Sequence, residues 1–389
     1  MNMLNVKALA TLALLMSSAS AVTDNAAIAQ DVSTKTVGND VVEGATPNVY
    51  LTQAAAGVNA LQSWYVPANG LYQTTAWWNS ANAVTVLANY STISGSKFYL
   101  PVLQNTFTQA QKLYPGFLNH FYDDEGWWAL AWIAAYDVTT DQQYLSMAQS
   151  IFADMAGGWD VSTCGGGIWW NKDRRYKNAI ANELFLSAAA QLANRIVDPA
   201  QKAHYLTWAK MEWQWFRHSG MINSHNLIND GLDSSVPSHC VNNGQAVWSY
   251  NQGVVLGGLV DFGKAGQADP TLLASAKVIA DAALLYLTDA NGVLHDQGEL
   301  KGGAGGGGVQ FKGVFVRNLV SLDERLPKSQ YSKFFTVNAD SIWNNARGSN
   351  YQFGQVWSGP YNGASAGSQS SALDTFIAAV EVTNSQRLP

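Results

Sequence analysis

The sequence predicts an all-α protein that folds as a single (α/α)6 barrel. From residue 49 onward, apolar residues recur at helical spacing in about a dozen segments, and the two-residue alternation typical of strands is almost absent. Every second segment is rich in Ala, Gly and Val and apolar all round, as expected of helices inside a protein. The segments between them are charged and amphipathic. Six inner and six outer helices in alternation favour a barrel, and a helical solenoid is the structural alternative.

The predicted helices follow one another along the chain, and several carry clear boundary signals. Asp198-Pro199 and Asp269-Pro270 place a capping acid before a proline at the first helical position. Gly220 and Gly266 stand where helices should end. The twelve predicted ranges are 49–66, 76–93, 97–114, 124–138, 141–157, 177–196, 199–218, 247–264, 270–288, 309–325, 328–346 and 367–383.

The N-terminal residues read as a targeting segment rather than as part of the fold. Residues 1–21 combine Lys7, a short apolar run and the small-residue end Ala19-Ser20-Ala21, which predicts a secretory signal peptide cut before Val22. Residues 22–46 are small and polar without periodicity, so we expect a flexible lead-in. The helical repeat favours one (α/α)6-barrel domain over residues 47–389. We therefore expect a secreted, extracellular protein.

Composition limits the classes of partner. The net charge is −6, and no cluster of Lys and Arg suits a phosphate backbone, which argues against nucleic acid. No later segment looks long and apolar enough to cross a membrane, and residues 384–389 lack the hydrophobic tail of a lipid-anchor signal. We expect no stable membrane anchor. Fifteen Trp and sixteen Tyr, set against only 13% charged residues, suit a neutral ligand such as a sugar.

The two cysteines predict a structural cross-link. In an oxidising compartment, Cys164 and Cys240 most simply form one disulfide, closing a loop of about 75 residues. The six histidines show no metal-binding spacing, so neither a metal nor another cofactor is expected. Asn89-Tyr90-Ser91 is a glycosylation sequon, which makes Asn89 a candidate glycosylation site.

Polar and aromatic residues gather just before the predicted inner helices. In a closed barrel these helix ends converge on one rim, where six loops would build one cleft lined by carboxylates, amides and indoles. Amides and aromatic rings suit sugar hydroxyls and the apolar faces of sugar rings, although any one Trp can simply be core. The candidate substrate-binding residues are Trp77, Trp78, Asn79, Asn82, Trp127, Trp128, Trp169, Trp170, Lys177, Asn178, Tyr250, Asn251, Gln252, Phe311 and Lys312.

Asp123 and Asp124 are the candidate catalytic residues. They open a helix in the stretch Asp123-Asp124-Glu125-Gly126-Trp127-Trp128, where unpaired acids would be poor core material. Hydrolysis of a glycosidic bond needs two carboxyl groups, and two adjacent ones favour a shared proton because like charges resist ionising together. The alternative is a plain helix cap. Spacing alone leaves open which acid has which role.

Other polar residues give weaker signals. Asp230, Asp233, Asp296 and Glu299 lie in predicted loops, where they could be structural or could contact substrate. The glycine run 302–308 lacks the Lys-Ser/Thr ending of a phosphate-binding loop, so we interpret it as a flexible lid or linker.

These motifs together resemble glycoside hydrolase family 76, the endo-α-1,6-mannanases that include fungal cell-wall relatives. The matching pieces span nearly the whole chain after the N-terminal segment. They are Ala76-Trp77-Trp78-Asn79-Ser80-Ala81-Asn82-Ala83, Tyr122-Asp123-Asp124-Glu125-Gly126-Trp127-Trp128, Gly167-Ile168-Trp169-Trp170, Tyr176-Lys177-Asn178-Ala179 with Asn182-Glu183-Leu184-Phe185, Tyr250-Asn251-Gln252-Gly253, and Phe311-Lys312-Gly313-Val314-Phe315-Val316-Arg317.

The resemblance implies an (α/α)6 barrel and a retaining double displacement on α-1,6-linked mannan or mannooligosaccharides. It assigns Asp123 as the nucleophile and Asp124 as the acid/base, with loop aromatics and amides holding successive mannose units. Fungal members that act as transglycosylases usually carry a C-terminal anchor signal, which this chain lacks, and this favours a hydrolase. A cell-wall transglycosylase, a non-catalytic mannan-binding protein and an (α/α)6 enzyme acting on uronic acids are the alternatives.

Overall fold

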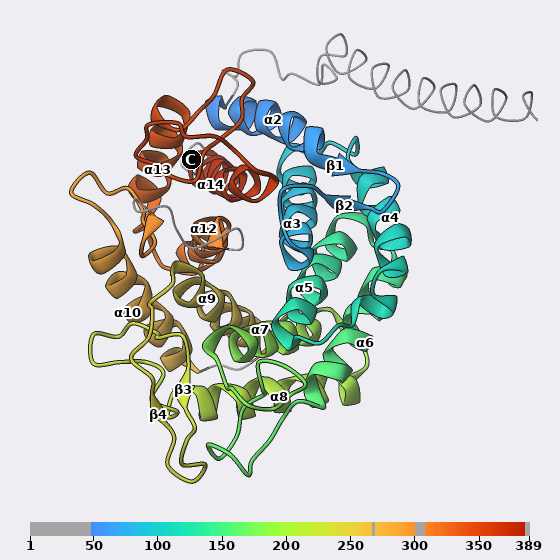
Figure 1. Cartoon of the computed structure of the whole chain (residues 1–389), viewed down its shortest axis with the longest axis vertical. Coiled ribbons are helices and arrows are strands. Elements are labelled where there is room, and N and C mark those ends of the chain that lie inside the picture. Colours follow the sequence, from blue (N-terminus) through green and yellow to red (C-terminus); the bar gives the residue numbers. More distant parts are fainter. Residues whose placement is uncertain (1–47, 267–268, 300–307, 386–389) are drawn as a thin grey trace, which may run out of the picture. The chain divides into compact units, whose positions relative to one another are not determined.

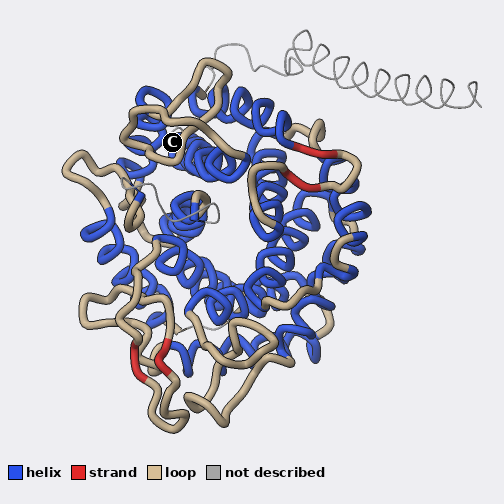
Figure 2. The backbone as a smooth tube through the Cα atoms, in the orientation of Figure 1, coloured by secondary structure: helices blue, strands red, loops and turns tan. Residues whose placement is uncertain are grey.

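The computed structural model describes residues 48–266, 269–299 and 308–385. The predicted signal peptide, the lead-in and most of the glycine run lie outside the described residues, so those predictions stay untested. In the described ranges the secondary structure is almost entirely helical, with two small hairpins (Figure 2). The all-α fold class is confirmed.

All twelve predicted helices are present, most with ends within a few residues of the prediction. The six outer helices are α2 (Val49–Leu61), α4 (Leu100–Gln109), α6 (Gln142–Ala156), α8 (Pro199–Phe216), α10 (Pro270–Leu287) and α13 (Ser332–Asn345). The six inner helices are α3 (Trp77–Ser94), α5 (Tyr122–Thr139), α7 (Ala179–Arg195), α9 (Ser249–Lys264), α12 (Phe311–Asp323) and α14 (Ala366–Ser385).

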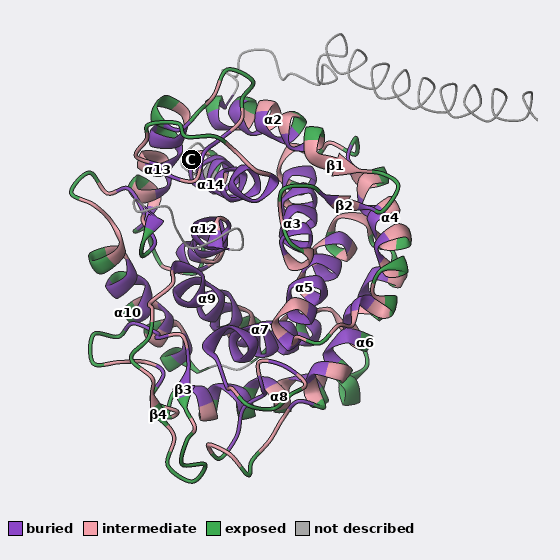
Figure 3. Cartoon of the chain, viewed as in Figure 1, coloured by how far each residue is buried: buried purple, intermediate pink, exposed green. Residues whose placement is uncertain are grey.

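The inner helices form a closed ring. Each packs on the next along the chain, and α14 packs back on α3, which excludes the open solenoid (Figure 1). The outer helices lie around this ring. Inner helices are therefore covered on all sides, whereas outer helices are buried on one face and exposed on the other (Figure 3). This burial explains why the inner sequences are apolar all round.

Small residues let the inner helices approach closely. A Cβ at Gly313 of α12 would lie 2.5 Å from the Cα of Ser371 on α14, so only glycine fits there. The predicted caps also form: the Asp198 carboxylate accepts a hydrogen bond from the Gln201 amide and the Asp269 carboxylate from the Thr271 amide.

The first helix is shorter than predicted. It ends at Leu61 and continues through the 3-10 turn Gln62–Trp64 into β1 (Tyr65–Val66), which pairs antiparallel with β2 (Leu71–Tyr72). A second hairpin joins β3 (Leu232–Asp233) to β4 (Val241–Asn242). Short 3-10 helices cover Ala110–Lys112 and Pro115–Phe117. Irregular segments of this kind precede the inner helices and form the rim.

The predicted disulfide is present and fastens two rim segments together. Cys164 lies in the loop before α7 and Cys240 lies in the β3–β4 hairpin before α9, with the sulfurs bonded at 2.06 Å. The amide of Cys164 also donates to the carbonyl of Pro237 at 2.8 Å. The two loops are therefore held as one unit.

Helix α10 corrects one expectation. With 18 residues and a mean hydropathy of 1.4, it is by length and composition alone apolar enough to cross a membrane. The prediction that no later segment passes that test is wrong. In the structure α10 is an outer helix that packs on α9.

Asn89 does not lie on a surface loop. It is half-buried in inner helix α3, where it lines a cavity of about 170 Å³ with Arg317 and Glu324, and the sequon hydroxyl of Ser91 is buried. Glycosylation of Asn89 stays a prediction.

Candidate active site

The two adjacent aspartates begin helix α5 at the rim. Asp123 and Asp124 lie in its first turn, directly after the extended residue Phe121, and both side chains are half-buried. Asp123 lies one turn before Trp127, so the two side chains share a face of the helix. Trp127 contacts Trp78 of α3 and Tyr250 of α9, so the face of α5 that carries Asp123 is turned toward the other inner helices.

Hydrogen bonds fix both carboxyl groups. The indole Nε1 of Trp170 donates to Oδ2 of Asp123 at 2.9 Å, and the amide of Asp124 donates to Oδ1 of Asp123 at 3.0 Å. Oδ2 of Asp124 accepts a 2.6 Å bond from the side-chain amide of Asn119. Each acid is therefore held in one orientation before any substrate arrives.

The pair shares a proton near neutral pH. Burial raises the pKa of both aspartates, and the neighbouring charge of Asp124 raises the pKa of Asp123 further. Hydrogen bonds from Trp170 and Asn119 oppose these shifts in part. Because two such groups titrate together, the pair loses its two protons in two steps as pH rises. Both steps occur at a higher pH than is usual for aspartate.

The third acid of the stretch has a structural role. Glu125 is fully buried, and its Oε1 accepts hydrogen bonds from Lys172 Nζ at 2.8 Å and from the Asn119 amide at 3.2 Å. Burial raises the pKa of Glu125 to about 8, although Lys172 opposes the shift. Glu125 thereby connects the Asn119 loop to α5, and Asn119 in turn holds Asp124.

Four aromatic rings form a floor beneath the pair. Trp78 of α3, Trp127 of α5, Tyr250 of α9 and Phe311 of α12 contact one another in a closed circuit, and we call this cluster the aromatic floor. The ring centroids are 5.5 Å apart for Trp78 and Trp127, 6.3 Å for Trp127 and Tyr250, 3.7 Å for Tyr250 and Phe311, and 6.2 Å for Phe311 and Trp78. One apolar surface thus closes the mouth from within.

Only one tryptophan of each predicted pair reaches this region, because successive helical residues face different directions. Trp128 is fully buried against Phe117 and Trp77, with centroid distances of 4.8 and 4.9 Å. In the loop pair, Trp170 holds Asp123, whereas Trp169 is buried beside Lys177. Trp128 and Trp169 are core residues in this structure, and the half-buried Trp77 packs on Trp128. Their assignment to substrate stays a prediction.

The two predicted lysines are also structural. Lys177 is fully buried, and its ammonium donates to the carbonyls of Asp160, Thr163 and Gly166 at 2.6, 2.7 and 2.6 Å. Lys312 is buried beside Glu299 and donates to the carbonyl of Gln355 at 2.7 Å. Both ammonium groups therefore hold rim loops in place and are not exposed to a ligand.

The predicted amides are buried too. Asn79 donates to Gln310 at 2.6 Å, Gln252 exchanges hydrogen bonds with the backbone of Ile228, and Asn178 caps α7. Asn82 accepts a hydrogen bond from Arg317, and Asn251 is fully buried. These amides are buried, and their assignment to substrate stays a prediction.

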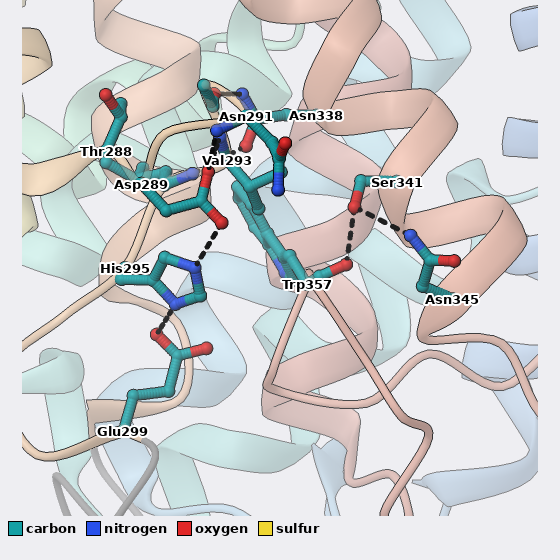
Figure 4. Close-up of polar contacts among 12 residues, drawn as sticks. Thr288, Asp289, Asn291, Val293, His295, Glu299, Asn338, Ser341, Asn345 and Trp357 are labelled. Carbon is teal, nitrogen blue, oxygen red and sulfur yellow. Dashed lines mark hydrogen bonds and ion pairs between the residues drawn. The ribbon is translucent and has the colours of Figure 1, made fainter.

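The weaker acidic candidates divide into structural and rim residues. Asp296 caps α9 by accepting from the amide and hydroxyl of Ser249, both at 2.7 Å. Glu299 pairs with His295, which also contacts Asp289 (Figure 4). This chain of charges joins the segment before α12 to the end of α10.

Asp230 is different from these structural acids because it lies close to the aromatic floor. Its carboxylate accepts a hydrogen bond from the Tyr176 hydroxyl at 2.5 Å. Burial is the main cause that raises the pKa of Tyr250, and the charges of Asp230 and Asp123 raise this pKa further. Asp230 is therefore a further carboxylate near the catalytic pair. Among the described residues, no group of three or more His, Cys, Asp or Glu is placed to hold a metal.

Residues 33–388 match the model of the glycosyl hydrolase family 76. The chain belongs to this family. Among curated relatives, it is 32% identical over 149 residues to a mannan endo-1,6-alpha-mannosidase, DCW1, of Candida albicans, covering 35% of this chain and 32% of the relative. To a DCW1 of Candida glabrata it is 26% identical over 239 residues, covering 57% and 50%. These alignments span half of the relatives' length or less.

Solved family 76 structures share the fold. One is an inactive variant of the α-1,6-mannanase GH76A of Salegentibacter sp. HEL1_6 with α-1,6-mannotetraose, which is 24% identical with a TM-score of 0.78, covering 86% of this chain and 100% of the other. Another is Dfg5 from Chaetomium thermophilum with glucosamine, which is 19% identical with a TM-score of 0.74, covering 88% and 93%. The (α/α)6 barrel is confirmed.

Sequence reasoning missed two residues that shape this family 76 site. Asn119, which holds Asp124, is a lone polar residue in a loop and gives no signal. Tyr176 stands in a recognised motif, but its bond to Asp230 joins two loops 54 residues apart. Only the fold brings such pairs together.

Proposed function

We propose that the protein is a secreted, endo-acting α-1,6-mannanase that hydrolyses mannan with retention at the anomeric carbon. The observation that carries this proposal is the half-buried Asp123–Asp124 pair above the aromatic floor. Support comes from relatives named mannan endo-1,6-alpha-mannosidase. A structural neighbour, an α-1,6-mannanase bound to α-1,6-mannotriose, is an inactive variant with two consecutive aspartates replaced.

In the first step, an ionised Asp123 oxygen attacks the anomeric carbon of one mannose unit. The bond from that carbon to the linking oxygen breaks, and Asp124 gives its proton to this oxygen as the leaving sugar departs. Asp123 accepts two N–H hydrogen bonds, from Trp170 and from the Asp124 amide, whereas Asp124 accepts one from Asn119. The two donors to Asp123 oppose the rise in the pKa of Asp123 that burial and the charge of Asp124 cause, and the attack requires the shared proton to lie on Asp124.

In the second step, water attacks the same carbon of the glycosyl ester. Asp124, now ionised, takes a proton from the water, and the bond between the sugar and Asp123 breaks. The cycle restores one proton on the pair. Trp78 is the half-buried ring of the aromatic floor and offers a surface for the apolar face of a sugar ring. Burial strengthens the electrostatic interactions of both acids during the reaction.

Replacing each acid tests the assignment. Asp123→Asn and Asp124→Asn should each reduce cleavage of linear α-1,6-mannan by about 10³-fold or more, the scale of lost nucleophilic or acid/base catalysis. The exposed rim residue Asp173 offers a matched control, because Asp173→Asn touches neither acid. Circular dichroism should show an unchanged fold. Near-normal cleavage by both variants would reject the proposal.

Product analysis separates the remaining possibilities. A retaining hydrolase first releases the α-anomer, as read by NMR, and added acceptor sugar should not divert the product. Transfer to the acceptor would indicate a transglycosylase, and binding without turnover would indicate a mannan-binding protein. Secretion is tested by sequencing the N-terminus of protein recovered from culture medium, where a start at Val22 is expected.

A further inference from the structure

A polar cleft of about 520 Å³ lies on the rim, and its lining includes Tyr176 but neither Asp123 nor Asp124. Its volume is within the range of sites for small molecules. We call it the rim cleft. One wall comes from the loop before α7 and the other from the β3–β4 region. The residues that matter here are Arg175, Tyr176, Asp233, Ser234, Asn243 and Gln245.

The two walls of the rim cleft are fastened together. The Cys164–Cys240 disulfide joins the two loops that supply them. The backbones also meet directly, because the Leu232 amide donates to the Lys177 carbonyl at 3.0 Å and a Cβ at Gly231 would lie 2.7 Å from that carbonyl oxygen. The cleft is therefore a fixed feature of the rim.

Tyr176 is the best-defined part of the wall. Its hydroxyl donates to Asp230 at 2.5 Å and accepts from the side-chain amide of Asn243 at 2.9 Å. Asn243 is itself held, since its side-chain oxygen accepts from the Gln245 amide at 2.9 Å. A wall held in this way can meet a ligand with little loss of conformational entropy.

The lining suits a neutral polyhydroxy ligand. Within the described ranges, the side chains of Arg175, Ser234 and Gln245 make no hydrogen bond to protein and are available. Arg175 and Asp233 are both exposed and carry opposite charges, so the cleft selects neither anions nor cations. Amide, hydroxyl and charged groups at fixed positions match the mixed donors and acceptors of a sugar.

The rim cleft is walled off from the catalytic pair. Trp170 donates to Asp123 on one side, and its ring stands edge-on to Tyr176 at a centroid distance of 6.2 Å on the other. The lining contains neither catalytic aspartate nor Trp170. Trp170 therefore separates the rim cleft from Asp123 and contacts a residue on each side.

We propose that the rim cleft binds a neutral sugar unit carried as a branch on the main chain, which makes it the site that determines tolerance of branched substrates. This inference rests on the proposed mannanase function. Its ligand class is a single hexose unit, such as a mannose attached at a secondary hydroxyl of the main-chain unit beside the catalytic pair.

The test measures how replacing two cleft residues changes the cleavage of a branched and of a linear substrate. The double variant Arg175→Ala/Gln245→Ala removes two exposed side chains without breaking a protein contact. Its kcat/KM on α-1,6-mannohexaose with one α-mannosyl branch should fall about tenfold, the size of one or two hydrogen bonds, and stay within about twofold on the linear hexaose. Arg174→Ala is the matched control, because Arg174 donates to Gly157 instead of lining the cleft.

Equal losses on both substrates would overturn the inference in favour of a main-chain subsite, and no loss on either would remove the cleft from substrate binding. Calorimetry can measure the binding of both hexaoses to the Asp123→Asn/Asp124→Asn protein, with and without the cleft substitutions. This measurement tests the cleft separately from the proposed mannanase function. Weaker binding of only the branched hexaose supports the cleft even if the parent enzyme cleaves no mannan. Cleavage of linear mannan with no such difference leaves the function standing and refutes the cleft.

Discussion

Lys177 gives the sharpest contrast between a binding and a structural role. Its ammonium lies inside the protein, where it donates to three backbone carbonyls of the 160–166 loop and stands 4.8 Å from the ring of Trp169. Burial lowers its pKa to about 8, so it remains charged at neutral pH. The substitution Lys177→Met keeps the length of the side chain and removes every donor.

The expected cost follows from the exposure of the three acceptors. Gly166 is buried, so its carbonyl loses its partner outright, whereas Asp160 and Thr163 are half-buried and water can replace the bond in part. Removing the ammonium also removes the free-energy cost of burying a charge, which offsets part of this loss. We therefore expect a decrease of about 3 kcal/mol in the free energy of unfolding. For a domain of this size that is a drop of about 5 °C in Tm.

Urea unfolding followed by tryptophan fluorescence measures this loss, with Lys210→Met on the exposed face of α8 as the control. Below its new Tm, the Lys177→Met enzyme should keep the KM of the parent for linear mannan. A variant with parental stability and a KM raised tenfold would refute the structural assignment and restore Lys177 as a substrate contact.

Three further predictions concern pH and cross-linking. Activity as kcat/KM should be bell-shaped with limbs near about 6 and about 8, the raised pKa values of the aspartate pair, because only the singly protonated pair can react; a profile falling only above pH 10 would contradict this. Cys164→Ser/Cys240→Ser opens a loop of 76 residues and should cost about 4 kcal/mol in unfolding free energy by urea titration, and an unchanged midpoint would contradict that estimate. Hydrogen bonding to Glu299 is the main cause that raises the pKa of His295, so this contribution to stability is full below pH 6.5 and is lost as pH rises through the folded pKa. In His295→Gln that slope of stability against pH should be absent, and a parental slope would assign it to other groups.

The fold was predictable because it rests on a repeated local pattern. A helix buried on all sides must be apolar on all sides, so the alternation of Ala-rich and charged segments reports directly which helices are inside. Closure of the ring, as opposed to an open solenoid, is decided by the packing of α14 on α3. The end of α2 was misplaced because a hairpin between Tyr65–Val66 and Leu71–Tyr72 competes with the helix, and such pairing is not visible in the periodicity of either segment.

The site was predictable in part. Two neighbouring acids ahead of a buried helix are expensive to bury without a purpose, so Asp123 and Asp124 stand out from the sequence. The flanking residues do not, because a motif does not say which way each side chain points. Trp127 and Trp128 are adjacent, yet one joins the aromatic floor and the other lies among Phe117 and Trp132.

The amino-acid sequence by itself determined the alternation of inner and outer helices, the cross-link between Cys164 and Cys240 and the location of the acidic pair, because each depends on residue type and spacing along one chain. Tertiary structure alone decided that Lys177 and Lys312 hold loops and that Asn119 and Trp170 orient the acids. It also decided that the rim cleft lies beside Tyr176. Those roles depend on contacts between loops distant in sequence. The direction of a side chain and the residues that it contacts are set only when the ring closes.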